Sequence, residues 1–347
     1  MIRINKRALL VLAAACLVWG DAQVHAEGRN RVGTAAAPEL LIPVGARDMA
    51  LGGASIATTS GIESLHWNPA GLSRSENNVD LMVSTMDYIA GIQVNYAALG
   101  GTFPALGNLA LSIKSLDIGE IPVTTETQPD GTGGNFQPTF LTLGVHFGRN
   151  LTDRIGLGTT LNYIVNRIDR AEGTAMSFSA GLQYFDLGGI DGLDLGVVVK
   201  HIGQRLRYEG SALLNRGQVN SLRRGPSFYG VQSSSADLPS TFELGLSYNY
   251  PVQDMGELNF SSVFEHQNYS YDQYKMGVEY MYNDFLALRG GFDYAADAVD
   301  DSYLFGQSFG LGLNLGSKGS SRARLDYAYS SVDRFDALNT FTLQVGF

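Results

Sequence analysis

Apolar and polar side chains alternate along most of this chain, and its last ten residues show the pattern most clearly. The apolar side chains there share one face: Phe341, Leu343, Val345 and Phe347. Because successive side chains of a strand point to opposite faces, such a segment has one apolar and one polar face. A series of these strands fits lipid on one side and water or a plug on the other. The alternation therefore predicts an all-β fold, a transmembrane antiparallel β-barrel.

A period of two gives fourteen predicted strands, which together form a barrel over residues 79–347. Their ranges are 79–86, 91–99, 108–117, 139–148, 155–165, 174–185, 193–202, 240–250, 257–266, 273–282, 285–294, 306–315, 322–331 and 338–347. The two longest connections, 118–138 and 203–239, both follow odd-numbered strands and so fall on one side. Bacterial barrels have short periplasmic turns and longer external loops, and these connections fit that rule. A soluble β-sandwich also has alternating strands, but it does not explain the one-sided loop lengths.

The two ends of the chain predict export to an outer membrane. Residues 1–26 have the basic start, apolar middle and small-residue cleavage site of a secretory signal. Cys16, the only cysteine, is either discarded with this signal or lipidated. In the first case the mature chain has no thiol, which excludes disulfides and zinc–thiolate sites. The terminal Phe347 resembles the insertion signal of outer-membrane proteins, so we expect the outer membrane of a Gram-negative-type bacterium.

Composition and charge restrict the classes of function that this chain can have. The whole chain carries 24 basic and 34 acidic side chains. Without the Arg3, Lys6, Arg7 and Asp21 of the signal, 21 basic and 33 acidic side chains remain, a net charge of −12. An acidic chain without a basic tail argues against a nucleic-acid partner. The 42 glycines and 17 tyrosines suit a barrel, where glycine fits crowded inner positions and tyrosine lies at the lipid–water boundary.

Residues 27–78 precede the first predicted strand and do not alternate. Small residues dominate from 43 to 75, and Asn68-Pro69 is a strong turn signal. A barrel of fourteen strands is too wide for its own side chains to fill, so an internal plug is physically sensible. We therefore predict that residues 27–78 form a hatch in the lumen, in which Gly52 and Gly53 allow close approach to the wall.

Two motifs in this segment resemble a known family. Gly45-Ala-Arg-Asp-Met-Ala-Leu-Gly-Gly-Ala and His66-Trp-Asn-Pro-Ala-Gly-Leu72 are similar to the N-terminal hatch of the PorV/PorQ family, which is FadL-like. The resemblance implies the following hatch residues: Gly45, Arg47, Gly52, Gly53, Trp67, Asn68, Pro69, Ala70 and Gly71. Trp67 before the turn favours PorV/PorQ over the related fatty-acid transporters. We expect its indole to pack against the wall and not to contact a ligand.

The same resemblance implies two alternative functions. PorV-like proteins of the type IX secretion system bind the C-terminal signal domains of exported proteins and pass them to a sortase-like enzyme at the surface. By this reading the chain is non-enzymatic, and its partners are secreted cargo domains or secretion-system proteins. The alternative is a FadL-like channel for hydrophobic small molecules such as long-chain fatty acids.

Six charged side chains are predicted to point into the lumen: Lys275, Glu279, Arg289, Asp293, Arg324 and Asp326. Facing lipid at the midplane would cost about 2–4 kcal/mol for each Arg or Lys, which demands the inward assignment. They either line a polar conduit or pair with each other and with hatch residues such as Arg47, Asp48 and Glu63. Because both signs occur together, pairing is the favoured interpretation.

The histidines do not suggest a catalytic or metal site. We predict that His146 faces inward alone, and that His201 and His266 lie near external strand ends. No histidine pair has metal-ligand spacing with a carboxylate, and Ser261 and Ser262 near His266 do not form a convincing esterase pattern. We therefore expect no enzyme activity and no cofactor.

The 203–239 connection combines arginines with aromatic residues. The candidate partner-binding residues are Arg205, Arg207, Tyr208, Arg216, Arg223, Arg224, Phe228 and Tyr229. Arginine forks match phosphate and carboxylate groups, and arginine and aromatic side chains are enriched at protein interfaces. The loop therefore contacts either lipopolysaccharide phosphates in the outer membrane or a protein partner.

Overall fold

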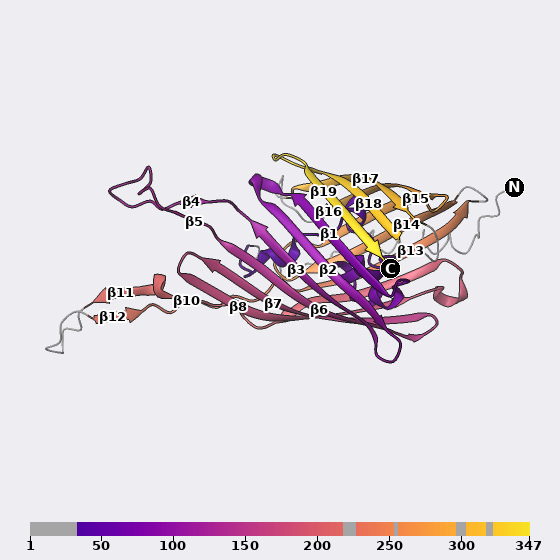
Figure 1. Ribbon diagram of the computed structural model, residues 1–347, viewed down its shortest axis with the longest axis horizontal. Coiled ribbons are helices and arrows are strands. Elements are labelled where there is room, and N and C mark those ends of the chain that lie inside the picture. Colours follow the sequence, from indigo (N-terminus) through magenta and orange to yellow (C-terminus); the bar gives the residue numbers. More distant parts are fainter. Residues whose placement is uncertain (1–32, 218–226, 253–255, 296–302, 317–321) are drawn as a thin grey trace.

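A computed structural model describes residues 33–217, 227–252, 256–295, 303–316 and 322–347. The predicted signal lies outside these residues. Within them, fourteen antiparallel strands form a closed barrel (Figure 1). Their bounds are β1 (Val79–Asp87), β2 (Gln93–Phe103), β3 (Gly107–Asp117), β6 (Thr139–Thr152), β7 (Ile155–Ile168), β8 (Ala171–Tyr184), β9 (Leu193–Gly203), β13 (Thr241–Val252), β14 (Gly256–Gln267), β15 (Gln273–Tyr282), β16 (Leu286–Ala295), β17 (Phe305–Leu315), β18 (Arg322–Val332) and β19 (Leu338–Gly346). The predicted fold is confirmed, and each of the fourteen predicted ranges overlaps one of these strands.

The first and last strands close the barrel. In the β1–β19 ladder Asp80 lies opposite Gly346, and Phe347 N donates to Val79 O at 2.9 Å. Closure matters because an open sheet edge would leave backbone N–H and C=O groups without partners in lipid. None of the helices in the described part of the chain is long and apolar enough to cross a membrane.

The two faces of the wall differ as the alternation predicts. On β19 the Phe341 side chain is 51% exposed on the outside, whereas Thr340 is fully buried on the inside. The same alternation of exposed and buried residues runs through β1 and β17. The outer face is therefore an apolar surface for lipid, and the polar face points into the lumen.

Two hairpins extend beyond the barrel at one end (Figure 1). One contains β4 (Ile121–Pro122) and β5 (Asn135–Phe136); the other contains β10 (Tyr208–Gly210), η7 (Ser211–Leu213), β11 (Leu214–Gly217) and β12 (Ser227–Gly230). These short strands were not predicted, because alternation over two to four residues cannot be told from chance. They belong to the two longest predicted connections, which confirms that these connections lie on the same side.

Residues 33–78 lie inside the barrel as short helices joined by turns. These are η2 (Pro38–Leu41), α2 (Ala46–Ala50), η3 (Gly61–Glu63), α3 (Ser64–Trp67) and η4 (Pro69–Arg74). Helix α2 packs against β16–β19, whereas η4 packs against β6, β7 and β8. We call this segment the hatch. Glycines allow the close approach: a Cβ on Gly52, whose φ is +63°, would lie 2.9 Å from the backbone nitrogen of Phe292.

The wall also uses glycine to make room for the hatch. A methyl group on Gly158 of β7 would collide with the backbone of Pro69 and Ala70, whereas one on Gly100 of β2 would meet nothing closer than 3.5 Å. We expect Gly158→Ala to lower the free energy of unfolding by about 1–3 kcal/mol, the usual effect of overpacking. Gly100→Ala should change it by less than about 0.5 kcal/mol. Urea unfolding in detergent micelles, followed by fluorescence, measures both, and equal effects would contradict this packing.

Candidate functional site: the hatch and the lumen

Asn68 fixes the turn in the middle of the hatch. Its backbone is extended, with φ −149° and ψ 106°, because the following Pro69 disfavours the helical region. The Asn68 side chain accepts a hydrogen bond from Ala70 N at 3.1 Å and so caps η4. Its amide nitrogen donates to Ile56 O at 2.8 Å and to Leu182 O on β8 at 3.3 Å. One buried carboxamide thus joins two parts of the hatch to the wall.

Trp67 is buried beside this turn. Its indole N–H donates to Val44 O at 2.9 Å, which links the two ends of the hatch motif. A Cβ on Gly53, whose φ is +75°, would lie 2.9 Å from the Trp67 ring, so this glycine makes room for the indole. On another side the Lys200 ammonium lies 5.6 Å from the ring centroid. The indole therefore packs inside the protein, mainly against other residues of the hatch.

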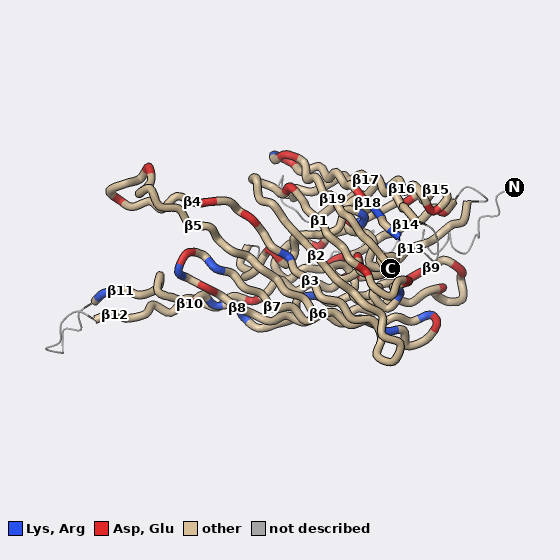
Figure 2. The backbone as a smooth tube through the Cα atoms, in the orientation of Figure 1, with Lys and Arg blue, Asp and Glu red and all other residues tan. Residues whose placement is uncertain are grey.

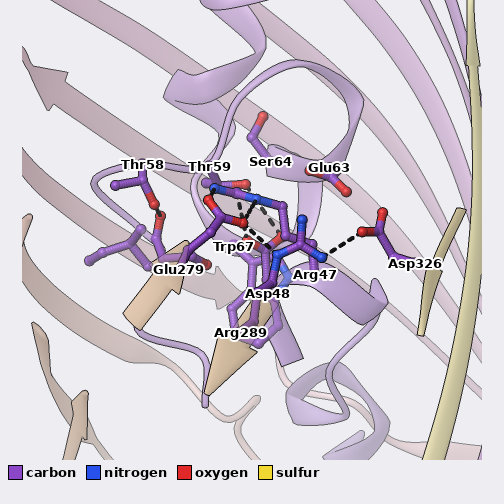
Figure 3. A network of polar contacts seen from close by, with 12 residues as sticks. Arg47, Asp48, Thr58, Thr59, Glu63, Ser64, Trp67, Glu279, Arg289 and Asp326 are labelled. Atoms are coloured by element: carbon purple, nitrogen blue, oxygen red, sulfur yellow. Dashed lines mark hydrogen bonds and ion pairs between the residues drawn. The ribbon is translucent and has the colours of Figure 1, made fainter. Parts of the chain in front are cut away.

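A chain of buried ion pairs connects the hatch to the strands on one side of the lumen (Figure 3). The guanidinium group of Arg47 on α2 donates two hydrogen bonds to the carboxylate of Glu279 of β15, from Nε at 3.0 Å and from Nη2 at 2.8 Å. Glu279 also accepts from Arg289 of β16, whose Nη1 donates to Asp326 Oδ1 at 2.6 Å. Arg324 of β18 pairs with Asp326 at 2.7 Å and also with Glu63 of η3. We call these residues the ion ladder.

The ion ladder keeps its charges despite burial. Burial by itself lowers the pKa of Arg47, but the carboxylates of Glu279 and Asp48 outweigh this effect and raise the pKa above its ordinary value. Arg47 therefore remains protonated at every physiological pH. Because a buried charge without a partner is strongly unfavourable, each member depends on the next. The ion ladder thus holds α2 and η3 of the hatch against the wall.

All six predicted lumen charges point inward, but two of them lie outside the ion ladder. Lys275 pairs with Glu265 of β14, and Asp293 accepts a hydrogen bond from Tyr303. Lys200 and Glu243 form another buried pair at 2.6 Å, between β9 and β13. The predicted lumen charges did not include Glu265, Glu243 and Lys200. Strand parity alone would have placed each of them on the inner face.

One histidine prediction was wrong. His146 does not face inward alone, because His66 of the hatch and His201 of β9 line the same small cavity. His146 is held between Ser112 Oγ and Thr160 Oγ1, both at 2.8 Å. No group of three or more His, Cys, Asp or Glu side chains in the described residues is arranged to hold a metal ion.

The external connection is only partly described. We call residues 203–217 and 227–239 the external arm; Arg223 and Arg224 lie outside the described residues. At its base, Arg205 pairs with Asp237 at 2.5 Å and Leu206 is buried. Tyr208 pairs with Gly173 of β8, and the neighbouring Arg207 is half-buried. Farther out, Arg216, Phe228 and Tyr229 are exposed on the β11–β12 hairpin. The predicted loop residues thus divide between a packed base and an exposed tip.

A closed barrel with an apolar outer face and a polar lumen that holds an N-terminal hatch defines an outer-membrane β-barrel protein. The family model described as the type IX secretion system protein PorV matches residues 25–229, more than half of the chain. This chain belongs to the PorV family, and its location is the bacterial outer membrane. No curated protein sequence matches it.

Solved structures with similar folds are FadL-like barrels. A deletion mutant of the monoaromatic hydrocarbon channel TodX aligns over 87% of this chain and 97% of its own, with 16% identity and a TM-score of 0.54. The Pseudomonas putida toluene transporter TodX aligns over 86% and 96%, with 14% identity and a TM-score of 0.52. A Pseudomonas aeruginosa FadL homologue aligns over 88% and 98%, with 12% identity and a TM-score of 0.51. At such low identity the likeness shows a shared fold.

Proposed function

We propose that this protein is a non-enzymatic outer-membrane barrel whose external arm binds exported proteins or partners of a type IX-like secretion system. The observation that carries the proposal is the exposed β11–β12 hairpin on a barrel of the PorV family. In the same proposal the hatch seals the lumen, so that the protein presents a binding surface while the membrane stays closed.

The chemistry of the external arm suits a protein partner. Phe228 is 73% exposed and Tyr229 is 55% exposed, and both lie on a hairpin that projects beyond the barrel. Leu214 of β11 is also exposed, opposite Gly230 in the hairpin register. Exposed apolar side chains of this kind mark interaction sites, and aromatic residues contribute strongly at interfaces. Lipid does not account for these residues, because the hairpin extends past the barrel wall.

Contact with lipopolysaccharide is a second use of the same surface. Arg216 is exposed on β11, where Figure 2 shows a basic segment, and it is free to meet phosphate groups. Arg205 is already paired with Asp237, so it is less available for this purpose. We therefore assign lipid and lipopolysaccharide contact to the barrel wall and the arginines, and partner binding to the aromatic tip.

The alternative function is a channel for hydrophobic small molecules. It is supported by the fold shared with TodX and the FadL homologue. Against it, the cavity between the hatch and the wall in the described residues has a volume of about 40 Å³, and most of its lining residues are polar. A cavity that holds benzene is larger, about 150 Å³, and apolar. We therefore favour partner binding over transport.

Removing the tip of the external arm tests the proposal. In the test variant a short Gly/Ser linker replaces residues 211–232, which keeps the Leu206–Ala236 bridge at the base. With the wild-type barrel as bait, pull-down from outer membranes followed by mass spectrometry should recover exported proteins. These proteins should all carry the same type of C-terminal domain. We expect the tip deletion to reduce their recovery at least about ten-fold, because exposed aromatic anchors dominate protein interfaces.

A second deletion provides the matched control. Replacing residues 121–136 removes the β4–β5 hairpin, which projects at the same end but carries acidic residues instead of basic ones (Figure 2). This control should leave recovery unchanged. If the wild type recovers no exported protein, or if both deletions act equally, the proposed binding surface is wrong. A lone barrel that holds co-purified fatty acid would support the channel instead.

A further inference from the structure

A polar cavity lies between the hatch and the wall strands β2, β3 and β6–β9. Its basic lining residues are two lysines and three histidines, Lys114, Lys200, His66, His146 and His201. The remaining lining residues are hydroxyl, amide and apolar side chains, and none is an aspartate or glutamate. A cavity rich in hydrogen-bond donors and without a lining carboxylate favours an occupant that accepts hydrogen bonds.

A bulge in β9 directs an extra side chain into this cavity. The β8–β9 ladder shifts register between Phe178 and Ala180, and His201 has a left-handed φ of 59°. As a result Lys200 and His201 both point inward, although they are consecutive in the chain. His201 N donates to Ser179 Oγ at 3.1 Å, which holds the bulge in place. Bulges of this kind re-aim side chains beside functional sites.

Two polar atoms of the cavity lining lack a partner among the described residues. His201 Nδ1 and Thr142 Oγ1 are buried and have no hydrogen-bond partner among the described residues. Their residues are only 6% and 7% exposed. Because buried polar groups are almost always hydrogen-bonded, these atoms require an occupant that hydrogen-bonds to them.

Lys114 supplies hydrogen-bond donors that the protein uses only in part. Its ammonium donates to Ile42 O at 3.1 Å and to Leu40 O at 3.5 Å. Within the described residues it has no carboxylate at ion-pair distance, whereas Lys200 has Glu243 at 2.6 Å. An ammonium has three donors, so one of those on Lys114 remains for a ligand.

We propose that this cavity binds a carboxylate group, held by Lys114, His201 and Thr142. Its volume is about 40 Å³. One water needs about 10–15 Å³ on this measure, so the cavity holds about three waters or one carboxylate. The carboxylate comes either from a small free acid or from the head of an amphiphile. The proposal does not depend on partner binding by the external arm.

Titration of the purified full-length barrel with acetate and with octanoate, followed by ligand-observed NMR in detergent, tests this site. We expect saturable binding to the wild type that Lys114→Met weakens at least about ten-fold, the usual effect of losing one charge-assisted hydrogen bond. A Lys275→Gln/Glu265→Gln control removes a buried ion pair of the lumen outside the cavity and should bind as the wild type does. Octanoate binding about ten-fold tighter than acetate would identify an amphiphile, and equal binding a small free acid.

Heat-modifiable gel migration verifies that each variant is folded. If Lys114→Met does not fold, Thr142→Val keeps the side-chain shape, removes the unpartnered hydroxyl and should weaken binding as well. The proposal is overturned if neither acid binds the wild type saturably, because the cavity then holds only water. It is also overturned if the folded cavity variants bind as tightly as the control.

Discussion

Replacing Trp67, Asn68 and Pro69 by alanine should raise the ion conductance of liposomes from near zero to a porin-like level. The triple variant removes the Asn68 hydrogen bonds to Ala70, Ile56 and Leu182 and the indole bond to Val44. It also removes the proline that begins η4. The hatch then loses the Asn68 bond to β8 and keeps the bonds from Gln183 of β8 to Ile56 O and Thr59 O, while the wall ladders that fold the barrel stay intact. Conductance of reconstituted protein measures the effect directly.

The control for this experiment is a triple alanine replacement in the external hairpin, at Val123, Thr124 and Thr125. These residues are exposed, and the change touches neither the hatch nor the lumen. This variant should show the same near-zero ion conductance as the wild type. If the hatch variant is silent too, residues 43–75 do not form the seal. The charged lumen residues around Arg289 and Asp293 would then be the next candidate.

Glu279→Gln should lower the free energy of unfolding by about 3–5 kcal/mol, the cost of breaking a buried ion pair from one side. The carboxylate of Glu279 serves both Arg47 and Arg289, so the neutral amide leaves two buried guanidinium groups short of negative charge. Urea unfolding in detergent micelles should show the loss.

A surface pair provides the comparison for Glu279. Arg322 and Glu76 lie 2.7 Å apart, but their side chains are 37% and 72% exposed. Exposed pairs contribute only about 0–1 kcal/mol, so Arg322→Gln should have a small effect. If the two variants lose equal stability, the ion ladder does not hold the hatch as its geometry indicates.

The barrel could be predicted because all its strands repeat the same alternation of apolar and polar side chains. Lipid outside and a polar lumen inside impose the same alternation on each strand, so Phe341 and Leu343 reveal their orientation without any knowledge of their neighbours. The turn at Asn68-Pro69 was predictable for a local reason, since proline restricts its own backbone and that of the residue before it.

The cavity could not be predicted, because its residues come together through a break in that periodicity. A bulge adds one residue, so parity counted along β9 gives the wrong orientation for His201. The pairing of Lys200 with Glu243 depends on the register between β9 and β13, which the sequence of either strand does not contain. The β11–β12 hairpin was missed because its strands have only four residues each.

The ion ladder also has a consequence for the order of assembly. Arg47 lies 232 positions before Glu279 in the chain, and Ala46 N binds the Thr342 hydroxyl across 296 positions. Contacts between such distant segments form late, because the chain between them must first be brought together. The segment that leaves the ribosome first among the described residues therefore completes its packing last, after the C-terminal strands have entered the membrane. Until then the side chains of Arg47 and Glu63 remain in water instead of in the ion ladder.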